Sequence, residues 1–149
     1  MPKFSDEMIL PFSPQQMYAL VADVASYDQF LPWVVGTRLF NKKENQFDAD
    51  LIVGFKMFKE RFTSRVNLTP NEKVYVDYIK GPMKYLYNDW RFEPHGESGS
   101  KVYFTVDFEF KSMIFQKVAG LFFEEATQKM MQAFIDRAKV VYGSQALGQ

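Results

Sequence analysis

The sequence has no cysteine and a single histidine, and these two absences remove several kinds of chemistry. Without cysteine there are no disulfides, thiolate nucleophiles or cysteine-bound metals. The one histidine, His95, lies in the turn-like run EPHGESGS, so neither a histidine zinc cluster nor a Ser-His-Asp set is expected. No spacing pairs Asp6, Asp77, Asp89 or Glu93 for acid-base work. We therefore predict a protein that is not an enzyme, with no metal site and no resident cofactor.

Excess charge and long apolar runs are also missing. Eighteen basic residues balance eighteen acidic ones, so no overall field attracts nucleic acid, and DNA is not an expected partner. No segment approaches the ~20 apolar residues of a spanning helix, and the first ten residues alternate like a strand rather than a signal peptide. We expect one domain over residues 1–149 with a flexible tail from about 143. We expect it in the cytoplasm, with peripheral contact at the inner membrane face left open.

Aromatic residues are abundant, at 17% of the 149 residues, and their spacing predicts the elements. Ser13 followed by Pro14 is typical of a helix start, and a second short helical segment leads to Trp33. Period-two alternation predicts strands near 3–10, 35–40, 47–55, 58–68, 74–79, 86–92 and 102–110.

The last long segment, roughly 112–142, repeats apolar residues every three or four positions and predicts a helix ~45 Å long. Only this helix is long enough to cover the apolar face of the sheet. The expected fold is therefore α+β of the helix-grip type: a curved antiparallel sheet of about seven strands, two short helices after strand 1, and a long C-terminal helix across the sheet. We expect a cavity between sheet and helix.

Alternate turns of a meander lie at the same end of the sheet, so the turns separate into two groups. Turns near 41–46, 70–73 and 94–100 are polar, whereas 55–59, 80–85 and 111–117 carry apolar residues beside lysines. The second group predicts a cavity mouth that docks on an anionic membrane, through Lys56, Met57, Phe58, Lys59, Met83, Tyr85, Met113, Ile114 and Phe115. The alternative is that these side chains fold inward and close the end of the core.

Three polar residues share the apolar faces of their strands, namely Glu60, Ser64 and Asn88. Buried polar groups require partners. These side chains are expected to bond one another, a cavity water, or the polar end of a ligand.

The run Tyr27, Phe30, Leu31, Pro32 and Trp33 resembles a motif of the coenzyme Q-binding protein family, within the START-like polyketide cyclase and lipid-transport superfamily. Asp28 stands where that motif has proline, and Val34 where cysteine often follows tryptophan. Gly81 and Pro82 before Leu86 and Trp90, and Phe108 to Ser112 before the helix, extend the resemblance from Phe4 to about Tyr142.

The resemblance implies a pocket for an isoprenoid quinone and a role in respiratory electron transport. The leading hypothesis is binding and delivery of ubiquinone or a related lipid, with the cavity lined by Trp33, Phe62, Val66, Trp90, Phe104 and Phe122. Bacterial relatives resemble a toxin of ribosome association, which implies instead that a basic strand face with Arg61 and Arg65 binds a ribosomal subunit. Cyclase-type catalysis is the least favoured reading.

Overall fold

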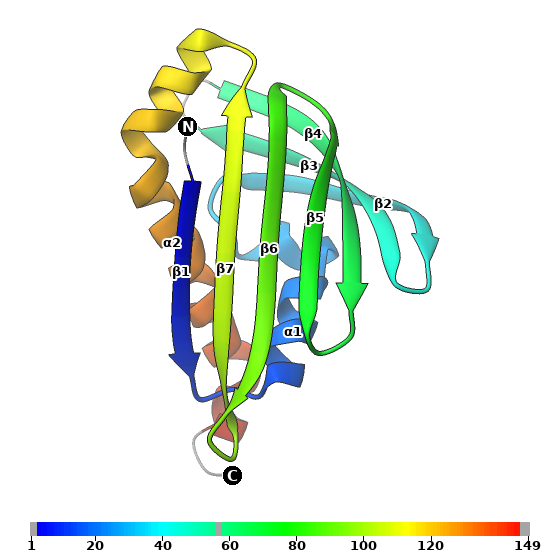
Figure 1. Ribbon diagram of the computed structural model, residues 1–149, viewed down its shortest axis with the longest axis vertical. Helices are drawn as coiled ribbons and strands as arrows, with labels where there is room; N and C mark the ends of the chain where they lie inside the picture. Colours follow the sequence, from blue (N-terminus) through cyan, green and yellow to red (C-terminus); the bar gives the residue numbers. More distant parts are fainter. Residues whose placement is uncertain (1–2, 56–57, 147–149) are drawn as a thin grey trace.

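A seven-stranded antiparallel sheet forms the main layer of the protein (Figure 1). The computed structural model describes residues 3–55 and 58–146. In sheet order the strands are β1 Lys3–Leu10, β7 Gly99–Phe110, β6 Met83–His95, β5 Lys73–Lys80, β4 Phe58–Thr69, β3 Gln46–Phe55 and β2 Val34–Lys43. From β2 to β7 each strand pairs with the next in sequence, which confirms the predicted meander, and β1 pairs with β7.

Three helical segments accompany the sheet. Helix α1, Pro14–Ala22, begins with a capping box in which Ser13 and Gln16 exchange hydrogen bonds, as the Ser13–Pro14 start predicts. The 3-10 helix η1, Val24–Gln29, follows, and α2, Met113–Ala146, closes the described chain. The predicted helix-grip fold is confirmed, and α2 continues four residues past the predicted 142.

The turn predicted at 80–85 is wrong in its extent. The structure turns at Gly81 and Pro82 alone, and β6 begins already at Met83. Gly81 has φ 148°, and a Cβ at this position would lie 2.6 Å from the Cβ of Phe62. Glycine is therefore required here because the turn packs directly on β4.

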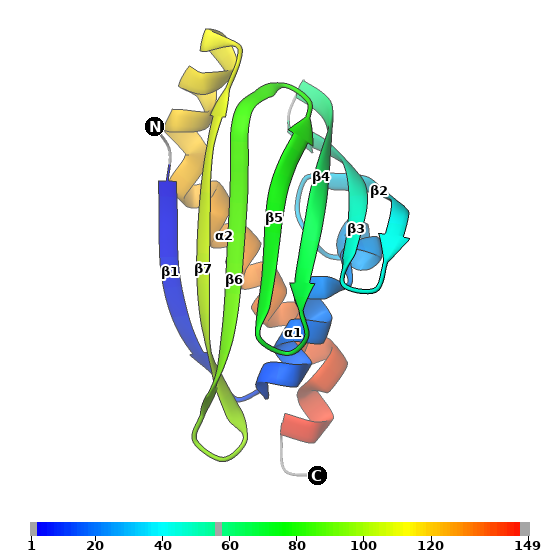
Figure 2. The same cartoon turned by 45° about the vertical axis from the view of Figure 1, so that its right-hand side comes forward.

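The packed core lies in the half of the molecule that holds α1 and the C-terminal half of α2 (Figure 2). Trp90 is its centre, with ring centroids 4.6 Å from Phe104 and 4.9 Å from Phe134. Toward the other end of α2, Ile114 and Leu121 are exposed. The C-terminal half of α2 thus packs in the buried core, and its N-terminal half contacts β7 through Phe123 and Phe115, whose ring centroids lie 5.2 Å from Phe108 and 5.8 Å from Phe110.

Candidate functional site

An apolar cavity of about 420 Å³ lies between the inner face of the sheet and α2. Strands β3 to β7, the segment from η1 to the start of β2, and α2 all contribute to its wall. The volume is within the range of about 300–1,000 Å³ typical of small-molecule sites. The cavity expected from the curved sheet and the long helix is therefore present.

The two ends of the cavity differ in exposure. At one end Val66, Trp90 and Phe134 are each 2% exposed. At the other end Phe122 is 36% exposed, and Pro82 and Phe115 are half-buried. A ligand would therefore enter between the first turns of α2 and the β5–β6 turn.

Five of the six predicted lining residues border the cavity: Trp33, Phe62, Val66, Trp90 and Phe122. Phe104 does not border it. Its ring packs in the core against Trp90 and, with a centroid distance of 6.0 Å, against Phe4 of β1. Strand alternation identified the inward side of β7 but not how deep each residue lies. That the five contact a ligand stays a prediction.

The residues predicted for the mouth differ widely in exposure. Lys56 and Met57 lie outside the described residues, while Phe58 begins β4 and is followed by the exposed Lys59. Met113 and Ile114 are 81% and 69% exposed at the start of α2.

The other three predicted mouth residues are not exposed tips. Met83 is buried at 5% exposure and borders the cavity, as does the half-buried Phe115. Tyr85 is not part of the cavity wall, and its hydroxyl donates to Asp107 at 3.1 Å. The predicted mouth therefore contains both inward and outward apolar side chains, because neighbouring residues of a strand or helix point in different directions.

Trp33, which borders the cavity, has an uncommon backbone conformation. Its φ of 69° is in the left-handed region, which is rare for a bulky residue. The Gly54 N–H donates to the Trp33 carbonyl at 2.8 Å and ties this residue to the end of β3. Backbone strain of this kind is often found at binding sites.

Most polar groups in the cavity wall already have partners. Asn88 donates to the Thr105 carbonyl at 2.9 Å and accepts from the Trp90 indole N–H at 3.0 Å. The Tyr27 hydroxyl donates to the Val21 carbonyl, and burial raises the pKa of Tyr27. The hydrogen bonds of the inward-facing Asn88 are therefore made within the protein.

Ser64 differs from these residues. It is 2% exposed, borders the cavity, and its hydroxyl has no hydrogen-bond partner among the described residues.

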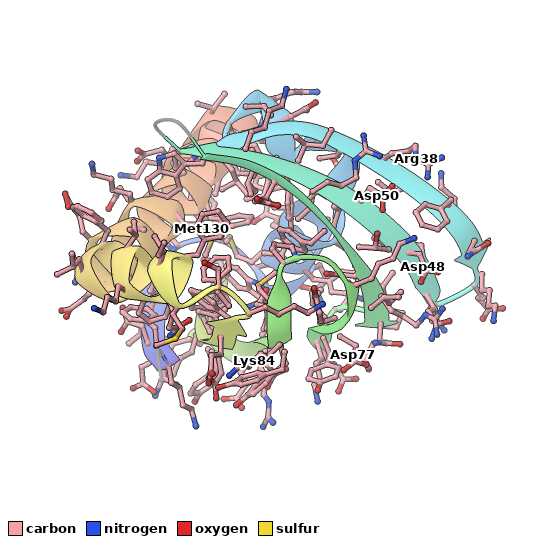
Figure 3. The ribbon with its side chains drawn as sticks, turned by 90° about the horizontal axis from the view of Figure 1, so that it is seen from above. Arg38, Asp48, Asp50, Asp77, Lys84 and Met130 are labelled. Atoms are coloured by element: carbon pink, nitrogen blue, oxygen red, sulfur yellow. The ribbon has the colours of Figure 1, made fainter. Side chains whose placement is uncertain are left out.

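The outer face of β2 to β4 holds a buried polar cluster that the sequence did not reveal (Figure 3). Asp48 accepts from Arg65 Nε at 2.9 Å, and Asp50 accepts from the Thr63 hydroxyl and from Arg38. The hydrogen bond from Arg65 lowers the pKa of Asp48, and that from Thr63 lowers the pKa of Asp50. Of the two arginines predicted for a basic face, Arg65 is thus paired with a carboxylate, whereas Arg61 is exposed on the same strand.

The described residues form neither a metal-binding cluster nor a membrane-spanning helix. No set of three or more His, Asp or Glu side chains within it could hold a metal ion. No helix among its residues is long and apolar enough to cross a bilayer. His95 is exposed at the end of β6, in the polar turn where the sequence suggested it would lie.

The chain is similar to known proteins over most of its length. Residues 10–135 match the family described as polyketide cyclase / dehydrase and lipid transport. Over 144 residues the chain is 37% identical to the ribosome association toxin RatA of Escherichia coli, which covers 97% of this chain and 91% of the relative. It is 36% identical to the mitochondrial coenzyme Q-binding protein COQ10 homolog B of Xenopus laevis, covering 96% of this chain and 60% of that protein.

Solved structures give the same architecture. The solution structure of an 18 kDa protein from Caulobacter crescentus is 32% identical, with a TM-score of 0.78 and coverage of 96% of this chain and 99% of that chain. The Zhui aromatase/cyclase from Streptomyces has a TM-score of 0.82 at 14% identity, covering 93% of each chain. At that identity the likeness extends to the fold alone.

Proposed function

The chain belongs to the polyketide cyclase/dehydrase and lipid transport family, and on that premise we propose that it binds and delivers a hydrophobic small molecule without chemically changing it. The proposed ligand is ubiquinone or a related isoprenoid lipid, and the proposed role supports respiratory electron transport. Similarity to the coenzyme Q-binding proteins supports this choice of ligand.

The observation that carries the proposal is the apolar cavity of about 420 Å³. Transfer of an isoprenoid chain from water gains roughly 25 cal/mol per Å² of buried apolar surface, so a greasy ligand is held without many polar contacts.

Native mass spectrometry and solvent extraction test this directly. Protein purified from a quinone-producing host should carry a quinone that extraction releases. Protein purified from a quinone-deficient host should take up added quinone. Protein that stays empty in both cases would contradict the proposal.

We further propose that the exposed apolar start of α2 docks on an anionic membrane, where ligand is exchanged. Met113, Ile114 and Leu121 are 81%, 69% and 79% exposed, and Lys111 and Lys117 are exposed beside them. Apolar tips gain by entering the headgroup boundary, and each nearby lysine gains about 1 kcal/mol at an anionic surface. This surface adjoins the more exposed end of the cavity.

Replacing Ile114 and Leu121 together with serine should reduce flotation with vesicles that contain anionic lipid. The matched control is serine at Val140 and Val141, which are 77% and 46% exposed on the same helix. The two pairs are separated by roughly 30 Å at 1.5 Å per residue. Equal flotation of both variants, at the wild-type level, would show that docking occurs elsewhere.

A second candidate function is association with a ribosomal subunit, because relatives at 37% identity bear the name of a ribosome association toxin. Its predicted surface included Arg61 and Arg65. Arg65 pairs with the buried Asp48, so phosphate would compete with an existing ion pair for this side chain. Co-sedimentation with ribosomal subunits from the purified, ligand-free protein would favour this function, and no co-sedimentation would exclude it.

A cyclase-type enzyme is the least supported alternative. Glu60 is the one carboxylate in the described cavity wall. The hydroxyls of Tyr27 and Thr127 already donate hydrogen bonds to backbone carbonyls. A positioned acid-base pair is the usual requirement for such catalysis. The non-catalytic proposal predicts that extracted and supplied quinone have the same mass.

A further inference from the structure

The Ser64 hydroxyl is the starting point, because it is buried in an apolar wall without a partner. Ser64 is 2% exposed, and its Oγ accepts and donates no hydrogen bond to any described residue. A buried hydroxyl without a partner loses its bonds to water and gains nothing in return. A buried polar group without a partner calls for an explanation, and in a cavity wall a bound ligand would supply one.

The backbone holds Ser64 toward the cavity. Thr63 pairs with Lys80 and Ser64 with Tyr78, so Ile79 is an extra residue of β5 at this point. Bulges of this kind fix the direction of neighbouring side chains. On β3 the residue opposite Ser64 is Ala49, which is 1% exposed and also borders the cavity.

The charge of the wall limits what the hydroxyl can bind. Within the described lining there is no lysine, arginine or histidine, and Glu60 is a carboxylate on the same strand face as Ser64. An anionic headgroup would find no cation and would be repelled by Glu60. A neutral oxygen, by contrast, accepts a hydrogen bond from Ser64 at no such cost.

We propose that Ser64 donates a hydrogen bond to a neutral carbonyl oxygen on the ring of a ligand, and that this cavity therefore selects uncharged amphiphiles such as quinones over fatty acids. The inference rests on the proposed binding function and specifies the polar end of its ligand. Ser64 lies four residues along β4 from Glu60, which is half-buried. The ring therefore lies inside, and the chain of the ligand extends toward the more exposed end.

A two-ligand, two-variant experiment tests this assignment by isothermal titration calorimetry. Decylubiquinone carries ring carbonyls, and decylbenzene has the same alkyl chain and no oxygen. Ser64→Ala should weaken decylubiquinone binding about tenfold, the value of one hydrogen bond, and leave decylbenzene binding unchanged. Dodecanoate should bind the wild type more weakly than decylubiquinone.

Ser100→Ala is the matched control. Ser100 is also a buried serine, at 0% exposure, whose hydroxyl has no partner among the described residues, but it lies on β7 outside the cavity wall. This variant should bind both ligands like the wild type. Neither variant should melt below the wild type, because neither removes a hydrogen bond and each removes a buried hydroxyl that has no partner.

The outcomes separate the inference from the proposed function. Wild-type affinity of Ser64→Ala for decylubiquinone would overturn the role of Ser64 while leaving cavity binding intact. An equal loss for decylubiquinone and decylbenzene would also overturn it, since the effect would then come from cavity shape. Dodecanoate binding as tight as that of decylubiquinone would overturn the selection for neutral ligands. A wild type that binds neither neutral ligand would overturn both proposals.

Discussion

Truncating two phenylalanines of α2 should distinguish the fully buried end of the cavity wall from its exposed end. Phe134 is 2% exposed, and its ring lies 4.9 Å from Trp90, 5.5 Å from Tyr27 and 5.3 Å from Phe30 between centroids. Phe134→Ala should therefore lower the free energy of unfolding by about 3–5 kcal/mol. In a chain of this length that corresponds to a fall in melting temperature of roughly 6–20 °C.

Phe122→Ala should be milder. Both residues border the cavity, but Phe122 is 36% exposed, so its loss forfeits only part of the ~1.5–3 kcal/mol that burying a phenylalanine gains. We expect a loss of about 1–2 kcal/mol by that estimate. Urea unfolding of the ligand-free variants, followed by circular dichroism, gives both values. Equal losses for the two variants would refute the difference in burial between the two ends of the cavity wall.

Three further changes test other parts of the structure. Gly81→Ala should destabilise the protein by about 1–3 kcal/mol in urea unfolding, because the added Cβ would meet Phe62 at 2.6 Å. The pKa values of Asp48 and Asp50 are lowered in the folded protein, so the stability that these groups contribute is present above about pH 4 and is lost as pH falls through the folded values. Asp50→Asn should make the loss of unfolding free energy between neutral and acid pH shallower, and an unchanged slope would contradict the ion-pair account. His95→Ala should leave decylubiquinone affinity within twofold, whereas a tenfold loss, ~1.4 kcal/mol, would show that the exposed turn contributes to binding.

Much of the fold follows from local patterns in the sequence. Alternation on β3 and β4 correctly predicted the side chains that face the cavity, because successive side chains of a strand point to opposite faces. These are Ala49, Leu51, Phe62 and Val66. The sorting of turns into two ends follows from the meander alone and agrees with the strand order. The boundary of β6 was missed because a glycine-proline pair with flanking lysines reads as a longer loop than the tight turn that forms.

The sequence did not predict how deeply each inward residue is buried or how the strands pair in register. Phe104 and Trp90 both point inward and belong to the core, but only Trp90 also borders the cavity, because Phe104 packs against Phe4 of β1. Asp48 pairs with Arg65 of the neighbouring strand, and alternation within each strand does not reveal the register that brings these two residues together. The lack of a partner for Ser64 is likewise a three-dimensional property.

Tryptophan fluorescence tests the central claim, that the cavity binds a quinone, most directly. The sequence has two tryptophans, Trp33 and Trp90, and both border the cavity. A quinone ring in the cavity lies near both indoles and should quench their emission. Titration with decylubiquinone should give saturable quenching at one quinone per protein, and Trp33→Phe should retain saturable quenching of Trp90. Quenching that rises linearly without saturation, with the slope seen for free tryptophan, would contradict binding in the cavity.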